Sequence, residues 1–169
     1  MREKLQQEIT GTFAQLHRVL DAFKDSQFDT VPYSDSWTAG QVAEHIIKSA
    51  SGFPQLAESG KEKADRAMDE KTAGLKKLFL DMDHKMKSPE SIKPTATTHD
   101  KQETLDTLEK IRKEMEAAVM SHDLSLICEG ADMPGFGKLT IYEWADFTMT
   151  HMQRHTRQLE KILNALDNK

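Results

Sequence analysis

The segment TIYEWADFTMTHMQRHTRQLEKILNAL, residues 140–166, decides the fold of this chain. Its inward-facing residues recur every three or four positions, which is the pattern of an amphipathic helix. A capping box opens the helix, because the Thr140 hydroxyl can accept from a free backbone N–H while the Glu143 side chain reaches back. The predicted inward stripe consists of Ile141, Trp144, Thr148, His151, Met152, His155, Leu159, Ile162, Leu163 and Leu166.

The same period predicts three more long helices upstream. The first spans about residues 2–24, the second begins at a capping box formed by Thr38 and Gln41, and the third runs from Asp100 to about residues 122–123. Their stripes are Leu5, Ile9, Phe13, Leu16, Leu20 and Phe23 in the first, Val42, His45, Ile46, Ser49, Phe53 and Leu56 in the second, and Leu105, Leu108, Ile111, Met115 and Val119 in the third.

The connections between these helices are less regular. Residues 60–94 read as a long crossover with a short helix from about Glu70 to Lys85, which carries Leu75, Leu78, Phe79 and Met82. Residues 129–137 contain three glycines and one proline, which excludes a helix interior and predicts a tight loop. Strand-like alternation is almost absent, so the sequence predicts an all-α protein, a four-helix bundle in a single domain over residues 1–169. The long crossover permits the second and third helices to run parallel, although the sequence leaves that topology open.

Composition narrows the class of protein further. The chain has 169 residues, 37% of them hydrophobic, and a formal net charge of -5 from 23 basic and 28 acidic residues. This balance argues against binding nucleic acid, which requires clustered Lys and Arg. No apolar run is long enough to span a membrane, and the first ten residues lack the apolar core of a secretory signal. With Cys128 as the only cysteine, we expect a cytoplasmic protein without an internal disulfide.

Three histidines on helix stripes indicate a metal site. His151 and His155 are four residues apart, so they share one face of the predicted helix, and His45 lies on the stripe of another helix. Neutral imidazole binds zinc, nickel, copper and iron, and three histidines leave positions open for water or substrate. The alternative is that these are partly buried core histidines whose spacing is a coincidence. Shared coordination would offset the cost of burying three imidazoles, about 1–3 kcal/mol each.

Two polar residues beside the histidines are candidates for supporting roles. Gln158 lies three residues after His155 on the same helix face, where it could orient a ligand or a bound water, or simply be solvated. Glu44 precedes His45 but points about 100° away round the helix. Its spacing from Lys48 favours a surface ion pair over a catalytic base.

The remaining reactive or aromatic residues have plainer interpretations. Trp37 and Trp144 lie near the N-termini of the two histidine-bearing helices and could wall a pocket, although most such tryptophans are core residues. Cys128 has no evident base beside it, which disfavours a nucleophilic role. We do not expect the other histidines to be ligands, because they lie at stripe edges, in charged segments or at helix ends: His17, His84, His99 and His122.

Three stretches of the sequence together resemble the DinB/YfiT-like superfamily. They are SWTAGQVAEH at residues 36–45, PGFGKLTIYEW at residues 134–144, and the pattern His151-x-x-x-His155-x-x-Gln158; residues 79–81 and 88–89 of the crossover add to the likeness. The resemblance implies an up-down-down-up bundle and frequent homodimers. It also implies a nickel or zinc ion held by His45, His151 and His155.

The resemblance leaves the reaction open, because fold and family do not fix function. Some members of the superfamily are thiol-dependent enzymes, including bacillithiol S-transferases and a mycothiol-dependent isomerase. Our leading hypothesis is a metal-dependent transferase that joins a low-molecular-weight thiol to an electrophilic small molecule, since a metal deprotonates a coordinating thiol without a protein base. The alternatives are a metal-dependent hydrolase and a non-catalytic metal-binding stress-response module. His151 and His155 lack the intervening Glu of H-E-x-x-H metalloproteases.

Overall fold

The computed structural model describes residues 1–84 and 86–168 and shows a mainly helical chain. No helix among these residues is long and apolar enough to cross a membrane. The helices are α1 (Arg2–Asp21), α2 (Asp25–Phe28), α3 (Ala39–Ala50), α4 (Phe53–Glu58), α5 (Thr72–Phe79), the 3-10 helix η1 (Glu90–Ile92), α6 (Lys101–Ser121) and α7 (Ile141–Asp167). The strands are β1 (Gly60–Lys63), β2 (Leu126–Met133) and β3 (Gly137–Thr140).

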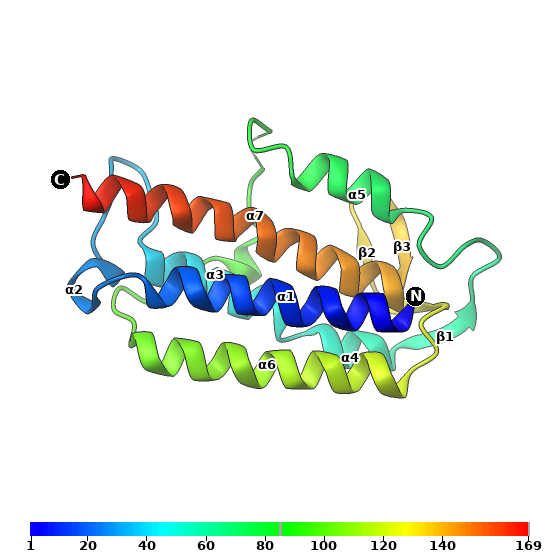
Figure 1. The fold of residues 1–169 in the computed structure, drawn as a ribbon. Coiled ribbons are helices and arrows are strands. Elements are labelled where there is room, and N and C mark those ends of the chain that lie inside the picture. Colours follow the sequence, from blue (N-terminus) through cyan, green and yellow to red (C-terminus); the bar gives the residue numbers. More distant parts are fainter. Residues whose placement is uncertain (85, 169) are drawn as a thin grey trace.

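The long helices lie alongside one another around one core (Figure 1). α1 and α7 run in one direction, while α3 and α6 run in the opposite one. α1 packs against α6 and α7, and α3 packs against the same two helices. The apolar stripes meet inside this group, where residues such as Leu16, Ile46, Met115 and Leu159 are fully or almost fully buried.

Both predicted capping boxes are present at the helices that carry the histidines. The Thr38 hydroxyl accepts from the backbone N–H of Gln41 at 3.2 Å, and the Gln41 side chain accepts from the Thr38 N–H at 3.1 Å. Thr140 and Glu143 repeat this pair at 3.1 and 2.9 Å. Each box satisfies backbone donors that have no partner inside the helix, so the prediction of these two helix starts is confirmed.

The second long helix is interrupted, contrary to the continuous stripe that we expected through Leu56. α3 ends at Ala50, and α4 begins at Phe53 with Pro54 in its first turn. Proline has no backbone N–H to donate to the carbonyl of Ala50, so a continuous helix would lose a hydrogen bond here. Phe53 still reaches the core from α4.

The predicted crossover helix is also shorter than expected. α5 ends at Phe79, before Met82, and the expected end at Lys85 lies outside the described residues. After Phe79, the carbonyls of the chain accept hydrogen bonds from Arg154 of α7, at 2.9 Å for Phe79 and 2.7 Å for Asp81. The Arg154 guanidinium thus supplies these carbonyls with donors, in place of the backbone N–H groups that a longer α5 would have provided.

The chain is mainly helical as predicted, but a purely α-helical fold is not confirmed, because the structure also contains a three-stranded antiparallel sheet in the order β1-β2-β3. Residues 129–137, expected to form a tight loop, instead contribute the end of β2 and the turn into β3. Gly135 and Gly137 have φ angles of 80° and 68°, which glycine adopts without strain. Strand β1 is distant in sequence from its partner β2, with Gly60 opposite Cys128. A pairing over this separation leaves no local pattern in the sequence.

A buried carboxylate fastens the crossover to the start of α7. The Glu143 side chain is 0% exposed and accepts two hydrogen bonds from the Arg66 guanidinium, at 2.7 and 2.8 Å. It also accepts from the backbone N–H of Lys71 at 2.8 Å. A buried charge is tolerated when it is paired and fully hydrogen-bonded, as it is here.

We therefore expect Glu143→Gln to lower the free energy of unfolding by about 3 kcal/mol, because it leaves the Arg66 charge without its partner. Glu109→Gln is the matched control, since Glu109 pairs with Arg112 on the exposed surface of α6. Its cost should stay below about 1 kcal/mol. Denaturant unfolding of the two variants checks this, and equal losses would contradict the role assigned to Glu143.

Candidate metal centre

The structure brings His45, His151 and His155 together between α3 and α7. Their Nε2 atoms form a small triangle, with His45 3.2 Å from His151 and 3.1 Å from His155, and with 3.1 Å between His151 and His155. The ligand atoms of the three residues all lie within 4.8 Å of one another. The expectation that imidazoles from two separate helices converge on one point is therefore met.

Hydrogen bonds at the opposite ring nitrogens fix two of the imidazoles. The Nδ1 atom of His45 lies 2.8 Å from the backbone carbonyl oxygen of Ile92, and Nδ1 of His155 lies 2.8 Å from the side-chain oxygen of Gln158. Both partners are acceptors, so Nδ1 carries the proton in each ring. The neutral rings then present unprotonated Nε2 atoms to the centre, and Gln158 lies where it can orient His155.

The third ring is held in the same way by Ser49 of α3. Its Oγ donates to the carbonyl of Ile46 at 2.9 Å, which leaves the oxygen free to accept from Nδ1 of His151 at 3.3 Å. All three Nε2 lone pairs therefore face the same point. Lone pairs about 3.1 Å apart repel one another unless a cation lies between them, and a single proton can bridge only one pair.

The surroundings favour the neutral form of each imidazole. Burial lowers the pKa of His155 to about 4, with a further contribution from His45, and the bond to Gln158 opposes the shift only in part. Burial also lowers the pKa of His45 and, more strongly, that of His151, which lies near the other two rings and Arg154. Neutral imidazole is the form that binds metals, so the three ligand atoms are free to coordinate near neutral pH.

The size of the triangle suits one divalent ion. Nitrogens bound at about 2.0–2.1 Å lie about 3.3 Å apart on a tetrahedral ion and about 2.9 Å apart at right angles on an octahedral one. The observed separations of 3.1–3.2 Å fall between these values. The three residues therefore fit a metal on one face and leave its other positions free for a further ligand.

Aromatic side chains lie beside the triangle. The Trp37 ring centroid lies 5.2 Å from that of His45, and the Phe147 ring stacks on His151 at 5.9 Å. Trp144 contacts Phe147 rather than the histidines, with ring centroids 5.8 Å apart. Trp144, Phe147 and Ser49 also line a surface cavity of about 420 Å³, so Trp144 borders a pocket beside the centre, while Trp37 is not among the residues that line it.

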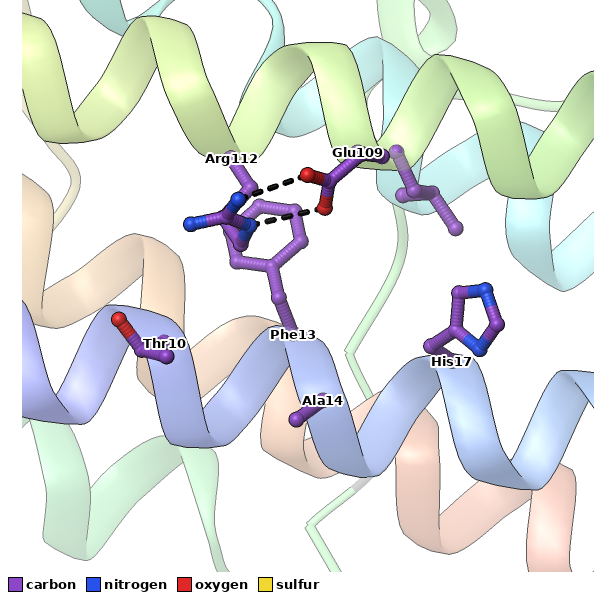
Figure 2. A pocket seen from close by; sticks show the side chains of 7 residues that line it. Thr10, Phe13, Ala14, His17, Glu109 and Arg112 are labelled. Atoms are coloured by element: carbon purple, nitrogen blue, oxygen red, sulfur yellow. Dashed lines mark hydrogen bonds and ion pairs between the residues drawn. The ribbon is translucent and has the colours of Figure 1, made fainter.

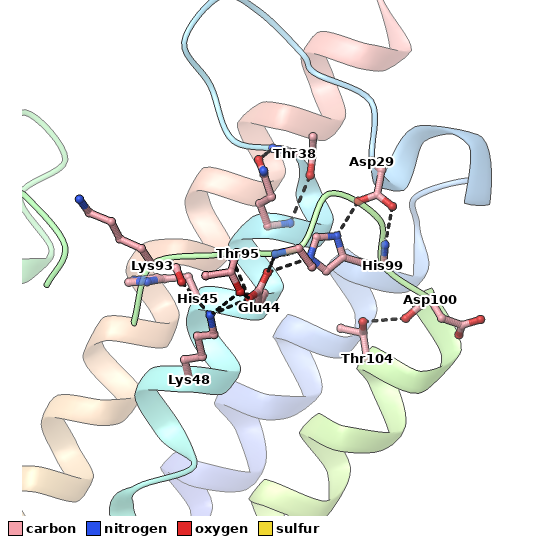
Figure 3. Close-up of polar contacts among 12 residues, drawn as sticks. Asp29, Thr38, Glu44, His45, Lys48, Lys93, Thr95, His99, Asp100 and Thr104 are labelled. Atoms are coloured by element: carbon pink, nitrogen blue, oxygen red, sulfur yellow. Dashed lines mark hydrogen bonds and ion pairs between the residues drawn. The ribbon is translucent and has the colours of Figure 1, made fainter. Parts of the chain in front are cut away.

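Glu44 forms the expected pair with Lys48, at 2.7 Å, but it is largely buried and has further partners. It accepts hydrogen bonds from the backbone N–H groups of Thr95 and Ala96, and it lies 3.0 Å from Nε2 of His99 (Figure 3). Although burial opposes the shift, these bonds lower the pKa of Glu44. A saturated carboxylate of this kind is a poor general base.

The other candidate residues lie away from the triangle. Cys128 is buried, which raises the pKa of its thiol to about 11 and makes it a weak nucleophile. His17 borders a separate surface cavity of about 310 Å³ between α1 and α6, beside the ion pair of Glu109 and Arg112 (Figure 2). None of the residues lining that cavity belongs to the triangle.

The sequence did not predict that the Ile92 carbonyl and Ser49 orient two of the imidazoles, or that His99 lies in a cluster of charged residues. The Ile92 carbonyl is a backbone group, for which the side-chain pattern carries no signal. His99 was expected at a helix end, and its ring is instead held between Asp29 and Glu44 with an exposed fraction of 8%. Asp29, Glu44 and His99 come from separate segments of the chain, so only the tertiary structure reveals their contact.

Comparisons with known proteins identify the family to which the chain belongs. The model of the DinB superfamily matches residues 8–159, so the chain belongs to this superfamily. The chain is 23% identical to the uncharacterised protein YuaE of Bacillus subtilis strain 168 over 149 residues, which cover 88% of this chain and 90% of YuaE. No solved structure gives a significant match.

The depressed pKa values predict that the metal-free protein loses stability as the pH falls from about 6.5 to 4. In this range the unfolded histidines take up protons that the folded ones do not, so acid favours unfolding. His155, whose folded pKa is about 4, should alone account for a loss on the order of 2–3 kcal/mol. Denaturant unfolding in chelator across this range checks the prediction, with His155→Gln expected to show a shallower dependence. Equal slopes for the two proteins would contradict it.

Proposed function

We propose that this protein holds one divalent metal ion, zinc or nickel, through His45, His151 and His155. The observation that carries the proposal is the convergence of three Nε2 lone pairs, each directed inward by an acceptor at Nδ1. Membership of the DinB superfamily supports the same assignment. The long helices act as a four-helix-bundle scaffold with an up-down-down-up path, in a single domain over residues 1–169 that we expect to form a cytoplasmic homodimer.

The purified wild type should contain about one equivalent of zinc or nickel, and His151→Ala should weaken binding by more than about 100-fold, because two imidazoles cannot replace three. His17→Ala is the matched control, since this exposed histidine of α1 lies outside the triangle. Metal analysis by mass spectrometry, followed by titration of the metal-free proteins, tests the proposal. A wild type that binds no more metal than His151→Ala would refute it.

We further propose that the centre serves a transferase that joins a low-molecular-weight thiol to an electrophilic small molecule. A bound divalent ion would deprotonate a coordinating thiol and supply a nucleophile near neutral pH. The protein itself has three tasks. The imidazoles hold the ion on one face, and Gln158, Ser49 and the Ile92 carbonyl each orient one of them. The rings of Trp37 and Phe147 shield the site from water. Glu44 is saturated by its own hydrogen bonds and is a poor base, so activation of the nucleophile would fall to the bound ion itself.

Metal-loaded protein should conjugate bacillithiol, or another small thiol, to monochlorobimane. In this reaction a carbon–sulfur bond forms, the carbon–chlorine bond breaks, chloride leaves with the bonding electrons and the thiol proton passes to solvent. The rate should fall by at least about 100-fold in His151→Ala, because the nucleophile is no longer activated. Fluorescence of the conjugate measures the rate, with protein-free thiol as the background.

The outcomes of this assay separate the alternatives. Turnover of an ester or amide without added thiol would replace the transferase with a hydrolase. Absence of any turnover, together with a melting temperature that falls on chelation, would indicate a structural ion in a binding module, because a structural ion adds its binding free energy to stability.

A further inference from the structure

Residues 92–99 lead from the crossover to the third long helix. Ile92, at the start of this segment, contacts the metal centre, and His99, at its end, lies in a charged cluster. Ile92, in η1, places its carbonyl oxygen against Nδ1 of His45. Residues 93–99 then run along α3 towards the start of α6 (Figure 3). The position of the Ile92 carbonyl therefore depends on what holds this segment against α3.

His99 fastens the far end of the segment through both of its ring nitrogens. Nδ1 lies 2.7 Å from one carboxylate oxygen of Asp29, and Nε2 lies 3.0 Å from a carboxylate oxygen of Glu44. The backbone N–H of His99 donates to the second oxygen of Asp29 at 2.7 Å. A neutral imidazole has one N–H and cannot donate to two carboxylates, so the geometry selects the imidazolium.

The charge balance of the cluster is consistent with that assignment. Burial disfavours the charged ring, but the bonds to Glu44 and Asp29 outweigh it and raise the pKa of His99. Lys48 is the other cation facing Glu44, at 2.7 Å. Two carboxylates are thus matched by two cations, and the partly buried charges are paired.

Close packing leaves the His99 ring little freedom to move. A Cβ atom placed on Gly40, in the first turn of α3, would lie 2.5 Å from both the Asp29 carboxylate and Nδ1 of His99. The ring and the carboxylate therefore lie directly against the α3 backbone. Only glycine permits this approach, which brings the end of α2, the crossover and α3 into one contact.

The middle of the segment is tied to the same helix turn that carries His45. The ammonium of Lys48 donates to the carbonyl of Lys93 at 2.8 Å and to the hydroxyl of Thr95 at 3.1 Å. Glu44 accepts from the backbone N–H groups of Thr95 and Ala96 at 2.9 and 3.1 Å. A chain of polar contacts thus runs from His99 to Ile92 and ends on Nδ1 of His45.

We propose that His99, held between Asp29 and Glu44, is a positioning residue of the metal centre. It anchors residues 93–99 on α3 and so fixes the Ile92 carbonyl that orients His45 with its Nε2 towards the ion. This inference rests on the proposed metal binding. It adds a residue outside the three ligands on which the affinity for the metal depends. Groups that orient a metal-bound histidine commonly change metal affinity by about 10–100-fold.

The test compares His99→Gln with His17→Gln, which makes the same replacement at an exposed position on α1. The metal-free proteins are titrated with cobalt(II), and both the dissociation constant and the visible absorption bands are recorded. His99→Gln should bind about tenfold more weakly, with altered bands, while His17→Gln should match the wild type. A loss of global stability alone would leave the bands of the folded protein unchanged.

Hydrogen exchange of the metal-free proteins supplies a second readout. The amides of Thr95 and Ala96 should exchange faster in His99→Gln, because their acceptor Glu44 loses its neighbour. Should His99→Gln fail to fold, Asp29→Asn removes the negative charge of one partner of the ring and carries the same expectations.

The outcomes distinguish the two proposals. Unchanged affinity and bands in the folded variant, with a wild type that binds cobalt, would overturn the role of His99 and leave the metal site standing. A wild type that binds no cobalt would overturn the metal site, and this inference with it.

Discussion

Three imidazole lone pairs meet at one point between α3 and α7, and the repulsion among them is the constraint on which the centre depends. Each ring is neutral because it is buried, and each is turned inward by an acceptor at Nδ1. Converging lone pairs are unfavourable inside a protein unless they share a cation. A buried polar group is costly when it has no partner, and the ion proposed above would give all three histidines the same partner.

The acceptors that orient the three imidazole rings come from three different parts of the chain. Gln158 is on the same helix face as His155, one turn away, and Ser49 faces His151 from the neighbouring helix. Ile92 belongs to the crossover and contributes only a backbone carbonyl. The crossover is therefore part of the centre rather than a passive connection, and it is held in place by buried and partly buried ion pairs at Glu44 and Glu143.

Local chemistry explains which elements the sequence could predict. Thr38, Thr140 and Asp100 start helices through hydrogen bonds that span only three residues, so their positions follow from the chain itself. The interruption before Pro54 is equally local and was overlooked because the apolar stripe continues across it. The sheet could not be predicted in this way, since β1 pairs with a strand more than sixty residues away.

The sequence by itself determined that the chain would form long amphipathic helices with His45, His151 and His155 on their inward faces, because helical period and capping act over a few residues. It also determined that His151 and Gln158 lie on the same face as His155. Only the tertiary structure decided that His45 meets the other two, that Ile92 and Ser49 orient the rings, and that His99 joins Asp29 to Glu44. These contacts link segments distant in the chain, and their geometry is set by how the helices and the crossover pack together.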